Sequence, residues 1–263
     1  MSRRADRRAL CSRMTGKISV EVCVDSVDTA MAAQAAGADR VELCANLLEG
    51  GTTPSAGVIA LARRKIGIKL HVMIRPRGGD FCYEADEVRV MENDITMAKQ
   101  LGADGVVFGI LDPDGSIDAT RMRGLLELAR PLKITCHRAI DMSRDLRKSL
   151  DALINLGVEY VLTSGGKQTA LEGSASIKGL VRAAGDRISI MAGGGVNERN
   201  VRDVISKTGI KQIHVGMSDR TPGPMKYRNE NISMGTAKGR EYDRFGASKE
   251  RLAKLVAACK SEA

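Results

Sequence analysis

The chain has 263 residues, 43% of them hydrophobic, with a net charge of +9, three phenylalanines, four tyrosines and no tryptophan. This length fits one large domain with a sizeable core, and no apolar run approaches the ~20 residues that span a bilayer. So few aromatic rings argue against a stacking surface for single-stranded nucleic acid, and neither a membrane nor a nucleic acid is an expected partner. Six cysteines without Cys-x-x-Cys spacing indicate reduced thiols in a cytoplasmic protein.

More than half of the net charge lies at the N-terminus. Residues 1–17 contain six basic residues against Asp6 alone, a net charge of +5, which leaves +4 for the rest of the chain. This segment could be a targeting or nucleic-acid-binding arm, but it lacks the apolar core of a secretory signal and is interpreted as a disordered extension. The predicted organisation is therefore a basic extension over residues 1–17 and one domain over residues 18–263.

A glycine-led segment recurs four times and indicates the fold. Each copy follows a helical pattern, begins with a glycine suited to the left-handed position past a helix end, and continues into a short strand. The copies begin at Gly37, Gly102, Gly157 and Gly209, which are 65, 55 and 52 residues apart. These spacings are about twice the ~30 residues of one βαβ step, so a second strand is expected between each pair.

Apolar runs rich in β-branched residues supply the intervening strands. They are Ile18–Val24, Leu70–Ile74, Leu132–Cys136 and Arg187–Ala192. Eight strands that alternate with helical segments in ~250 residues predict a closed (β/α)8 TIM barrel, with an open doubly wound sheet as the alternative.

Side-chain alternation along the glycine-led strands predicts which residues face the barrel interior. Val41, Val106, Val161 and Ile213 occupy positions expected to face the helices. The alternate positions form three rows of four, the form in which barrel interiors are filled. These rows are Arg40, Gly105, Tyr160 and Gln212; Glu42, Val107, Leu162 and His214; and Cys44, Gly109, Ser164 and Gly216. Because a polar interior costs free energy, the barrel is expected to bind a ligand at its C-terminal mouth.

Capping and turn signals predict the helices and loops. A cap at Asp25-Ser26 begins the first helix, Ser55 caps the second, and a long helix covers about Glu84–Leu101. Beyond the last strand, Met217–Phe245 is predicted to be a long polar loop that folds over the mouth or onto a neighbouring subunit. A disordered excursion is the alternative for this loop, and Ser248–Cys259 is predicted to be the closing helix.

Several motifs, in the correct order, resemble those of the CutC family, which is described as a family of copper homeostasis proteins. They are Glu21–Ser26, Gly37–Cys44, Gly50–Ser55, Met73–Phe81, Gly102–Gly109, His137–Asp141, Leu162–Gly166 and Met191–Val196. The resemblance runs from Ile18 to about Gly216 and excludes the first 17 residues. It implies a (β/α)8 barrel that is cytoplasmic and usually homo-oligomeric, with a connection to copper.

Cys23 and Cys44 are the candidate metal ligands, because they fall at equivalent inward positions on neighbouring strands near the mouth. Two thiolates with Met73 nearby form a soft site that selects Cu(I), whereas no further ligand pair stands at the spacing of structural zinc. The alternative is a pair of inert core thiols. His71 and His214 lie lower in the barrel and are interpreted as satisfied core histidines. With the family's copper connection, the first hypothesis is a copper-binding protein in which this cysteine pair holds Cu(I).

Glu21, Glu42, Arg75, His137 and Asp141 are the candidate catalytic residues, expected to converge at or below the mouth. A carboxylate pair beside a histidine and an arginine can carry out general acid–base chemistry, since mutual burial separates the pKa values of the pair. An interior salt-bridge network without turnover is the alternative.

Glycine pairs at the ends of neighbouring strands predict an anion site at the same mouth. Gly165 and Gly166 follow one strand, Gly194 and Gly195 follow the next, and Arg77 adds a cation. Tight turns that need positive φ are the alternative. These residues support a second hypothesis, an enzyme that acts on a phosphorylated or otherwise anionic small molecule, with metal-dependent hydrolysis left open.

Overall fold

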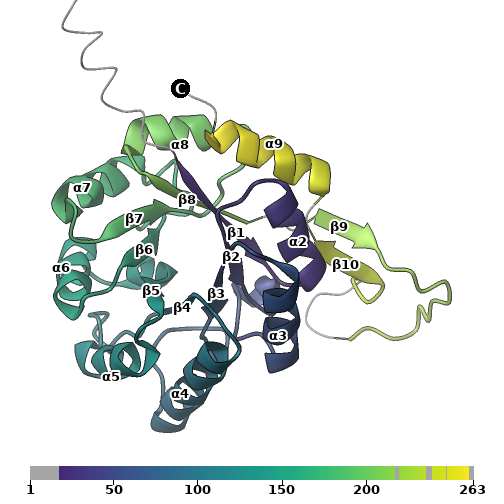
Figure 1. The fold of residues 1–263 in the computed structure, drawn as a ribbon, viewed down its shortest axis with the longest axis horizontal. Helices are drawn as coiled ribbons and strands as arrows, with labels where there is room; N and C mark the ends of the chain where they lie inside the picture. The colour runs from purple at the N-terminus through teal and green to yellow at the C-terminus, as the bar shows by residue number, and fades with distance from the viewer. Residues whose placement is uncertain (1–17, 217–218, 235–238, 247, 261–263) are drawn as a thin grey trace, which may run out of the picture.

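A computed structural model describes residues 18–216, 219–234, 239–246 and 248–260. Eight parallel strands close into a barrel in chain order, β1 to β8, with helices outside (Figure 1). The strands are β1 (Ser19–Val24), β2 (Arg40–Leu43), β3 (Lys69–Met73), β4 (Gly105–Phe108), β5 (Lys133–Cys136), β6 (Tyr160–Thr163), β7 (Ser189–Ala192) and β8 (Gln212–Gly216). The predicted (β/α)8 barrel is confirmed, whereas the predicted extension over residues 1–17 lies outside the described residues.

Each strand is followed by a helical segment that returns the chain to the start of the next strand. The α-helices are α2 (Val27–Ala35), α3 (Ala56–Lys65), α4 (Ala85–Gln100), α5 (Ala119–Ala129), α6 (Leu146–Leu156), α7 (Ser174–Ala184), α8 (Val201–Thr208) and α9 (Lys249–Lys260). Two short 3₁₀ helices follow strands at the mouth, η1 (Leu47–Glu49) after β2 and η2 (Arg138–Met142) after β5.

Local capping explains where several of these helices begin and end. The Ser26 hydroxyl accepts from the Thr29 N–H at 3.2 Å and the Thr29 hydroxyl accepts from the Ser26 N–H, which forms a capping box at α2. Ser55 caps α3 as predicted. Gly157 and Gly209 end α6 and α8 in the left-handed region, with φ of 76° and 73°.

The strands separate two groups of buried side chains. Val41, Val106 and Ile213 belong to the large core between the strands and the helices. Cys44 and Val107 belong to a second cluster inside the barrel, together with Met73 and the partly buried Cys23. The predicted alternation along these strands is therefore confirmed, and it is this alternation that brings the cysteines into the interior.

The barrel closes between β1 and β8, and α9 covers the junction. Glu21 on β1 lies opposite Arg40 on β2 and opposite His214 on β8. The buried side chains of α9, which include Leu252 and Leu255, pack into the main core beside α2 and α8 (Figure 1). The predicted closing helix is confirmed, and it shields the junction at which β1 carries Glu21 and Cys23.

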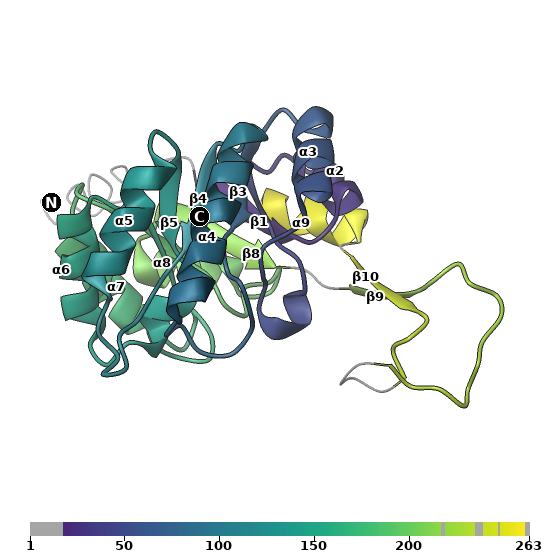
Figure 2. The ribbon, with the colours of Figure 1, turned by 90° about the horizontal axis from the view of Figure 1, so that it is seen from below.

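The segment after β8 differs from the sequence-based expectation. Within the predicted loop Met217–Phe245, β9 (Asp219–Pro222) pairs antiparallel with β10 (Asp243–Gly246) to form a separate two-stranded sheet. Figure 2 shows the described residues of this arm extending away from the barrel rather than across its mouth. For the described residues, the prediction of a loop that folds over the mouth is therefore wrong, and contact with a neighbouring subunit stays a prediction. No described helix is long and apolar enough to cross a membrane.

Candidate functional site at the mouth of the barrel

Two free cysteines meet at the C-terminal end of the barrel. The Sγ atoms of Cys23 and Cys44 lie 3.8 Å apart, Cys44 being buried and Cys23 partly exposed. The strand register places Cys23 opposite Glu42 on β2. Cys44 follows Glu42 by two residues, so it lies one inward-facing position closer to the mouth. The prediction that the two cysteines occupy equivalent positions is therefore wrong, although their thiols meet as predicted.

Glu42 joins the cysteine pair from below. One carboxylate oxygen, Oε2, lies 3.5 Å from Cys44 Sγ and 3.9 Å from His214 Nε2, whereas Oε1 is buried without a hydrogen-bond partner. Ligand atoms of Cys23, Cys44 and Glu42 all lie within 4.8 Å of one another. Burial raises the pKa of Glu42 well above its usual value, and the charge of Cys23 adds to this rise although His214 opposes it. Burial thus favours the protonated form of Glu42.

Glu21 is the ionised counterpart of Glu42. It pairs with Arg40 and accepts from His214 Nδ1 at 2.7 Å, and its side chain has no exposed surface. Burial would raise the pKa of Glu21, but the charge of Arg40 and the hydrogen bond of His214 hold it far below its usual value. Arg40 is itself fixed by Gln212 Oε1 at 3.0 Å.

His214 connects the two carboxyl groups with the thiol of Cys23. Burial would lower the pKa of His214, but the charge of Glu42 and contacts with Cys23 and Glu21 raise it well above its usual value. The Cys44 thiol lowers the pKa of Cys23 to about 6 by hydrogen bonding, and His214 adds to this effect. The same bond raises the pKa of Cys44. At neutral pH the pair therefore consists of one thiolate and one thiol.

His71 is a buried core histidine, as the sequence predicts. His214 is also buried, but it additionally contacts Glu42. His71 is buried, its Nδ1 lies 3.5 Å from Thr135 Oγ1, and burial lowers its pKa to about 4. His214 is also buried and satisfied, yet its second nitrogen reaches the group around Glu42. Its place in the same inward row as Glu42 was the only sequence signal for this contact.

Arg75 and His137 lie elsewhere in the mouth. Arg75 donates to the carbonyl oxygens of Glu49, Gly51 and Gly79 at 2.7 to 2.9 Å, which ties the loop after β2 to the loop after β3. The His137 ring packs against Phe81 at 5.0 Å, and burial together with Arg75 lowers its pKa to about 3.

Asp141 stabilises a loop rather than joining the other carboxyl groups. Its carboxylate accepts from the N–H groups of Ser164 and Gly166 at 2.9 to 3.1 Å and from the Ser164 hydroxyl at 3.0 Å. The Gly165 N–H donates to Thr163 Oγ1 at 2.8 Å. This turn thus already holds an anion, which is the chain's own carboxylate.

The hydrogen bonds consequently divide the candidate catalytic residues into separate groups. Glu21 and Glu42 share His214, whereas Arg75, His137 and Asp141 each bond to nearby loop backbone. Their joint acid–base role stays a prediction.

Arg77 and the second glycine pair also differ in their surroundings. Arg77 Nε donates to Glu87 Oε1 at 2.5 Å, its Nη1 lies 3.1 Å from Asp80 Oδ1, and its guanidinium lies over the ring of Tyr83. Gly194 and Gly195 follow β7 with φ of 100° and 67°. An anion-binding role for these residues stays a prediction, although Arg77 is already paired with two carboxylates.

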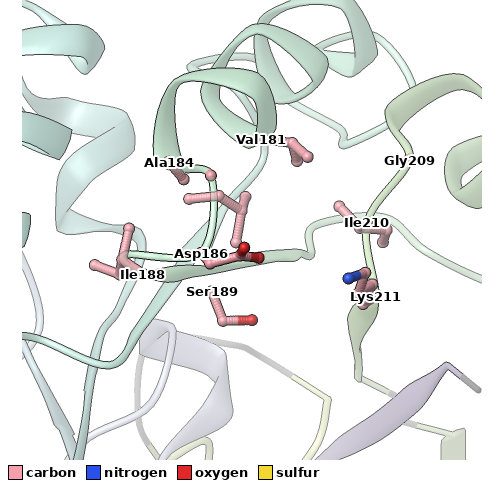
Figure 3. A pocket seen from close by; sticks show the side chains of 10 residues that line it. Val181, Ala184, Asp186, Ile188, Ser189, Gly209, Ile210 and Lys211 are labelled. Atoms are coloured by element: carbon pink, nitrogen blue, oxygen red, sulfur yellow. The ribbon is translucent and has the colours of Figure 1, made fainter. Parts of the chain in front are cut away.

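A cavity of about 300 Å³ lies at the opposite end of the barrel. Figure 3 shows Ala184 and Asp186 before β7, and Gly209 and Lys211 at the start of β8, around this space. These residues precede their strands or begin them, whereas ligand sites in such barrels lie at the C-terminal ends of the strands. We therefore place the functional site at the mouth and not in this cavity.

Comparison with known proteins identifies the relatives of this chain. The profile of the CutC family matches residues 18–219. A Bacteroides thetaiotaomicron relative, named as a family protein CutC, is 48% identical over 93% of this chain and 99% of its own length. A human relative named copper homeostasis protein cutC homolog is 47% identical over 83% of this chain and 80% of its own length.

Solved structures agree with these sequence relatives. The structure of CutC from Streptococcus agalactiae is 41% identical, has a TM-score of 0.72, and covers 76% of this chain and 98% of its own. Phosphoribosylanthranilate isomerase from Thermotoga maritima has a TM-score of 0.56 at 12% identity, over 92% of this chain and 98% of its own, which shows the fold alone. Because the family profile spans most of the sequence and the relatives approach half identity, the chain belongs to the CutC family.

Proposed function

We propose that this protein binds copper as Cu(I) between the Sγ atoms of Cys23 and Cys44 at the mouth of the barrel. The observation that supports this proposal is the 3.8 Å separation of two free thiols whose strands hold them together. Thiolate sulfur is a soft ligand, and soft ligands favour Cu(I) over Mg²⁺ and Ca²⁺. The names of the relatives, which include a copper homeostasis protein, agree with this choice of metal.

The surroundings of the pair fit a monovalent cation. Cys23 contributes a thiolate at neutral pH, and a second negative charge appears only when Cys44 loses its proton. Met73 packs in the same interior cluster as Cys44 and offers a third soft sulfur. Burial favours the protonated form of Glu42, which would become a hard oxygen ligand only after losing its proton.

Titration of the reduced full-length protein with Cu(I) tests this proposal, in competition with a chromophoric Cu(I) chelator. One Cu(I) per chain is expected, and Cys44→Ser should weaken binding by more than the roughly 10- to 100-fold that loss of a supporting residue costs a metal site.

Cys136→Ser is the matched control for this variant. Cys136 is fully buried in the main core, outside the mouth cluster, so this change also removes a buried thiol. It should leave Cu(I) affinity unchanged. If Cys44→Ser and Cys136→Ser bind Cu(I) as tightly as the parent, the proposed site is wrong.

A further inference from the structure

Arg138, the first residue of η2, is a cation whose guanidinium is held in place by hydrogen bonds at the mouth. Its Nε donates to Asp141 Oδ2 at 2.8 Å, and its Nη2 donates to the Ser164 hydroxyl at 2.7 Å. These bonds fix the guanidinium at the mouth, between the ends of β5 and β6. Nη1 has no hydrogen bond within the described part of the chain, and the side chain is 42% exposed. One edge of the guanidinium is therefore available to a ligand.

The loop after β7 presents backbone donors beside this edge. Among the described residues, the N–H groups of Gly194, Gly195 and Val196 form no hydrogen bond, whereas the carbonyl of Gly194 accepts from Ala170. Successive N–H groups in such a positive-φ turn make an anion-binding concavity. A Cβ atom on Gly194 would lie 3.2 Å from Arg138 Nη1, so the loop and the guanidinium are direct neighbours.

His137, which precedes Arg138 in the chain, carries a third, independent feature. His137 is 4% exposed, and its Nε2 is buried without a hydrogen-bond partner. Its Nδ1 accepts from the Ala139 N–H at 3.2 Å, and burial keeps the ring neutral by lowering its pKa to about 3. The hydrogen bond therefore assigns the proton to Nε2, which becomes a buried donor without an acceptor. A bound oxygen atom would supply that acceptor.

We propose that the mouth holds a second ligand site, in which Arg138 and the N–H groups of Gly194, Gly195 and Val196 bind the phosphate of a small phosphomonoester. His137 Nε2 donates to an oxygen of the organic part of the same ligand. This site lies in the segments that follow β5 and β7, whereas the proposed copper ligands lie on β1 and just after β2, so neither proposal depends on the other.

The number and type of donors select the ligand class. Three consecutive N–H groups and a guanidinium edge match the three terminal oxygens of a phosphomonoester, whereas a carboxylate offers only two oxygens. The carboxylate bonded to Arg138, that of Asp141, is already paired with this guanidinium and with backbone donors, which offsets its repulsion of an anion. Lys167, on the loop after β6, adds an exposed positive charge nearby.

Titration of the full-length protein with glycerol 3-phosphate tests the site directly. With ¹⁵N-labelled protein, the largest amide shifts are expected at Gly194, Gly195 and Val196, and calorimetry should give one site per chain. Arg138→Gln should weaken this binding by about 10- to 100-fold, since it removes a charge-assisted hydrogen bond. Arg89→Gln is the matched control: it removes an equal charge from an exposed side chain on α4, and it should leave binding unchanged.

Inorganic phosphate and acetate distinguish the possible ligand classes. Phosphate should bind more weakly than glycerol 3-phosphate, because it leaves His137 without an acceptor, and acetate should bind more weakly still. Equal affinity for acetate would overturn the assignment to phosphomonoesters. Absence of shifts at Gly194 and Gly195 at millimolar glycerol 3-phosphate would overturn the site itself, and this result needs no variant that has to fold.

Discussion

Two buried glutamates in the barrel interior have pKa values shifted in opposite directions because their neighbours differ. Glu21 accepts from Arg40 and His214, which lower its pKa, whereas Glu42 Oε1 has no hydrogen-bond partner and burial raises the pKa of Glu42. Divergent pKa values of this kind are typical of functional sites, although structural networks also produce them. Here Glu21, with the lowered pKa, joins β1 to β2 and β8 at the barrel closure, and Glu42, with the raised pKa, borders the thiols.

The opposite pKa shifts of Glu21 and Glu42 predict that matched Glu→Gln substitutions lower the free energy of unfolding by different amounts. Glu21→Gln leaves Arg40 buried without its carboxylate and should lower the free energy of unfolding by about 3–5 kcal/mol. Because burial favours the protonated form of Glu42, Glu42→Gln should exchange one uncharged group for another and lower the free energy of unfolding by no more than about 1 kcal/mol. Urea unfolding of both variants at pH 7 measures the difference. Similar losses in the two variants would show that Glu42 is also ionised in the folded protein.

The thiol pKa values predict how Cu(I) affinity varies with pH. Above pH 6, Cys23 is already a thiolate, so binding displaces only the proton of Cys44. Affinity should then fall about tenfold for each pH unit of acidification, because one proton is released per copper ion. Below about pH 6, Cys23 is protonated as well, and the slope should double.

Chelator competition between pH 5 and 8, corrected for the protonation of the chelator, measures this slope. The Cys136→Ser control should follow the curve of the parent, since the thiol of Cys136 lies in the main core. A curve with no change of slope near pH 6 would mean that Cys23 is not the low-pKa thiol.

At the scale of elements, the arm formed by β9 and β10 is the feature that the barrel does not explain. Its described residues leave four large apolar side chains exposed, Met225, Tyr227, Ile232 and Met234, at 55% to 75%. Figure 2 shows that the arm extends away from the barrel. Exposed apolar groups on one projecting element are typical of a contact with another chain. We propose that the arm packs on a second copy of this protein.

Replacement of residues 223–241 by a short Gly/Ser bridge tests the role of the arm. None of the described residues in this range belongs to the barrel core, so the melting temperature should stay close to that of the parent. The molar mass measured by light scattering should fall to that of a smaller assembly. As a control, the double variant Arg89→Gln/Arg147→Gln changes exposed residues on α4 and α6 and should keep the parent mass. An unchanged mass after arm replacement would exclude the arm as the subunit contact.

The sequence predicts some elements better than others. Elements whose stabilising contacts join residues close together in the chain are the easier ones to predict. Caps such as Ser26 and Ser55 act on residues three positions away, so their helices are readable locally. The pairing of β9 with β10 joins strands separated by a long segment, and both strands are polar and short. Alternation of apolar residues gives no signal for such strands.

At the scale of the whole molecule, the fold was predictable because four glycine-led repeats encode the barrel. The inward row predicted that Glu42 and His214 face the interior, and alternation brought Cys23 to Cys44. The partners of Arg138 and Asp141 were not predictable, because they depend on how three loops from β5, β6 and β7 meet in space. The arrangement of loops at the mouth is thus the part of the site that only the structure supplies.

X-ray absorption at the copper K-edge, on the reduced full-length protein loaded with one Cu(I) per chain, is the sharpest test of copper binding between Cys23 and Cys44. We expect an edge typical of Cu(I) and nearest-neighbour scattering from at least two sulfur atoms. Cys44→Ser should remove one of these sulfurs, and Cys136→Ser should leave the spectrum unchanged. A first shell of nitrogen or oxygen alone, or a spectrum that is the same in the Cys44→Ser variant, would contradict copper binding between Cys23 and Cys44.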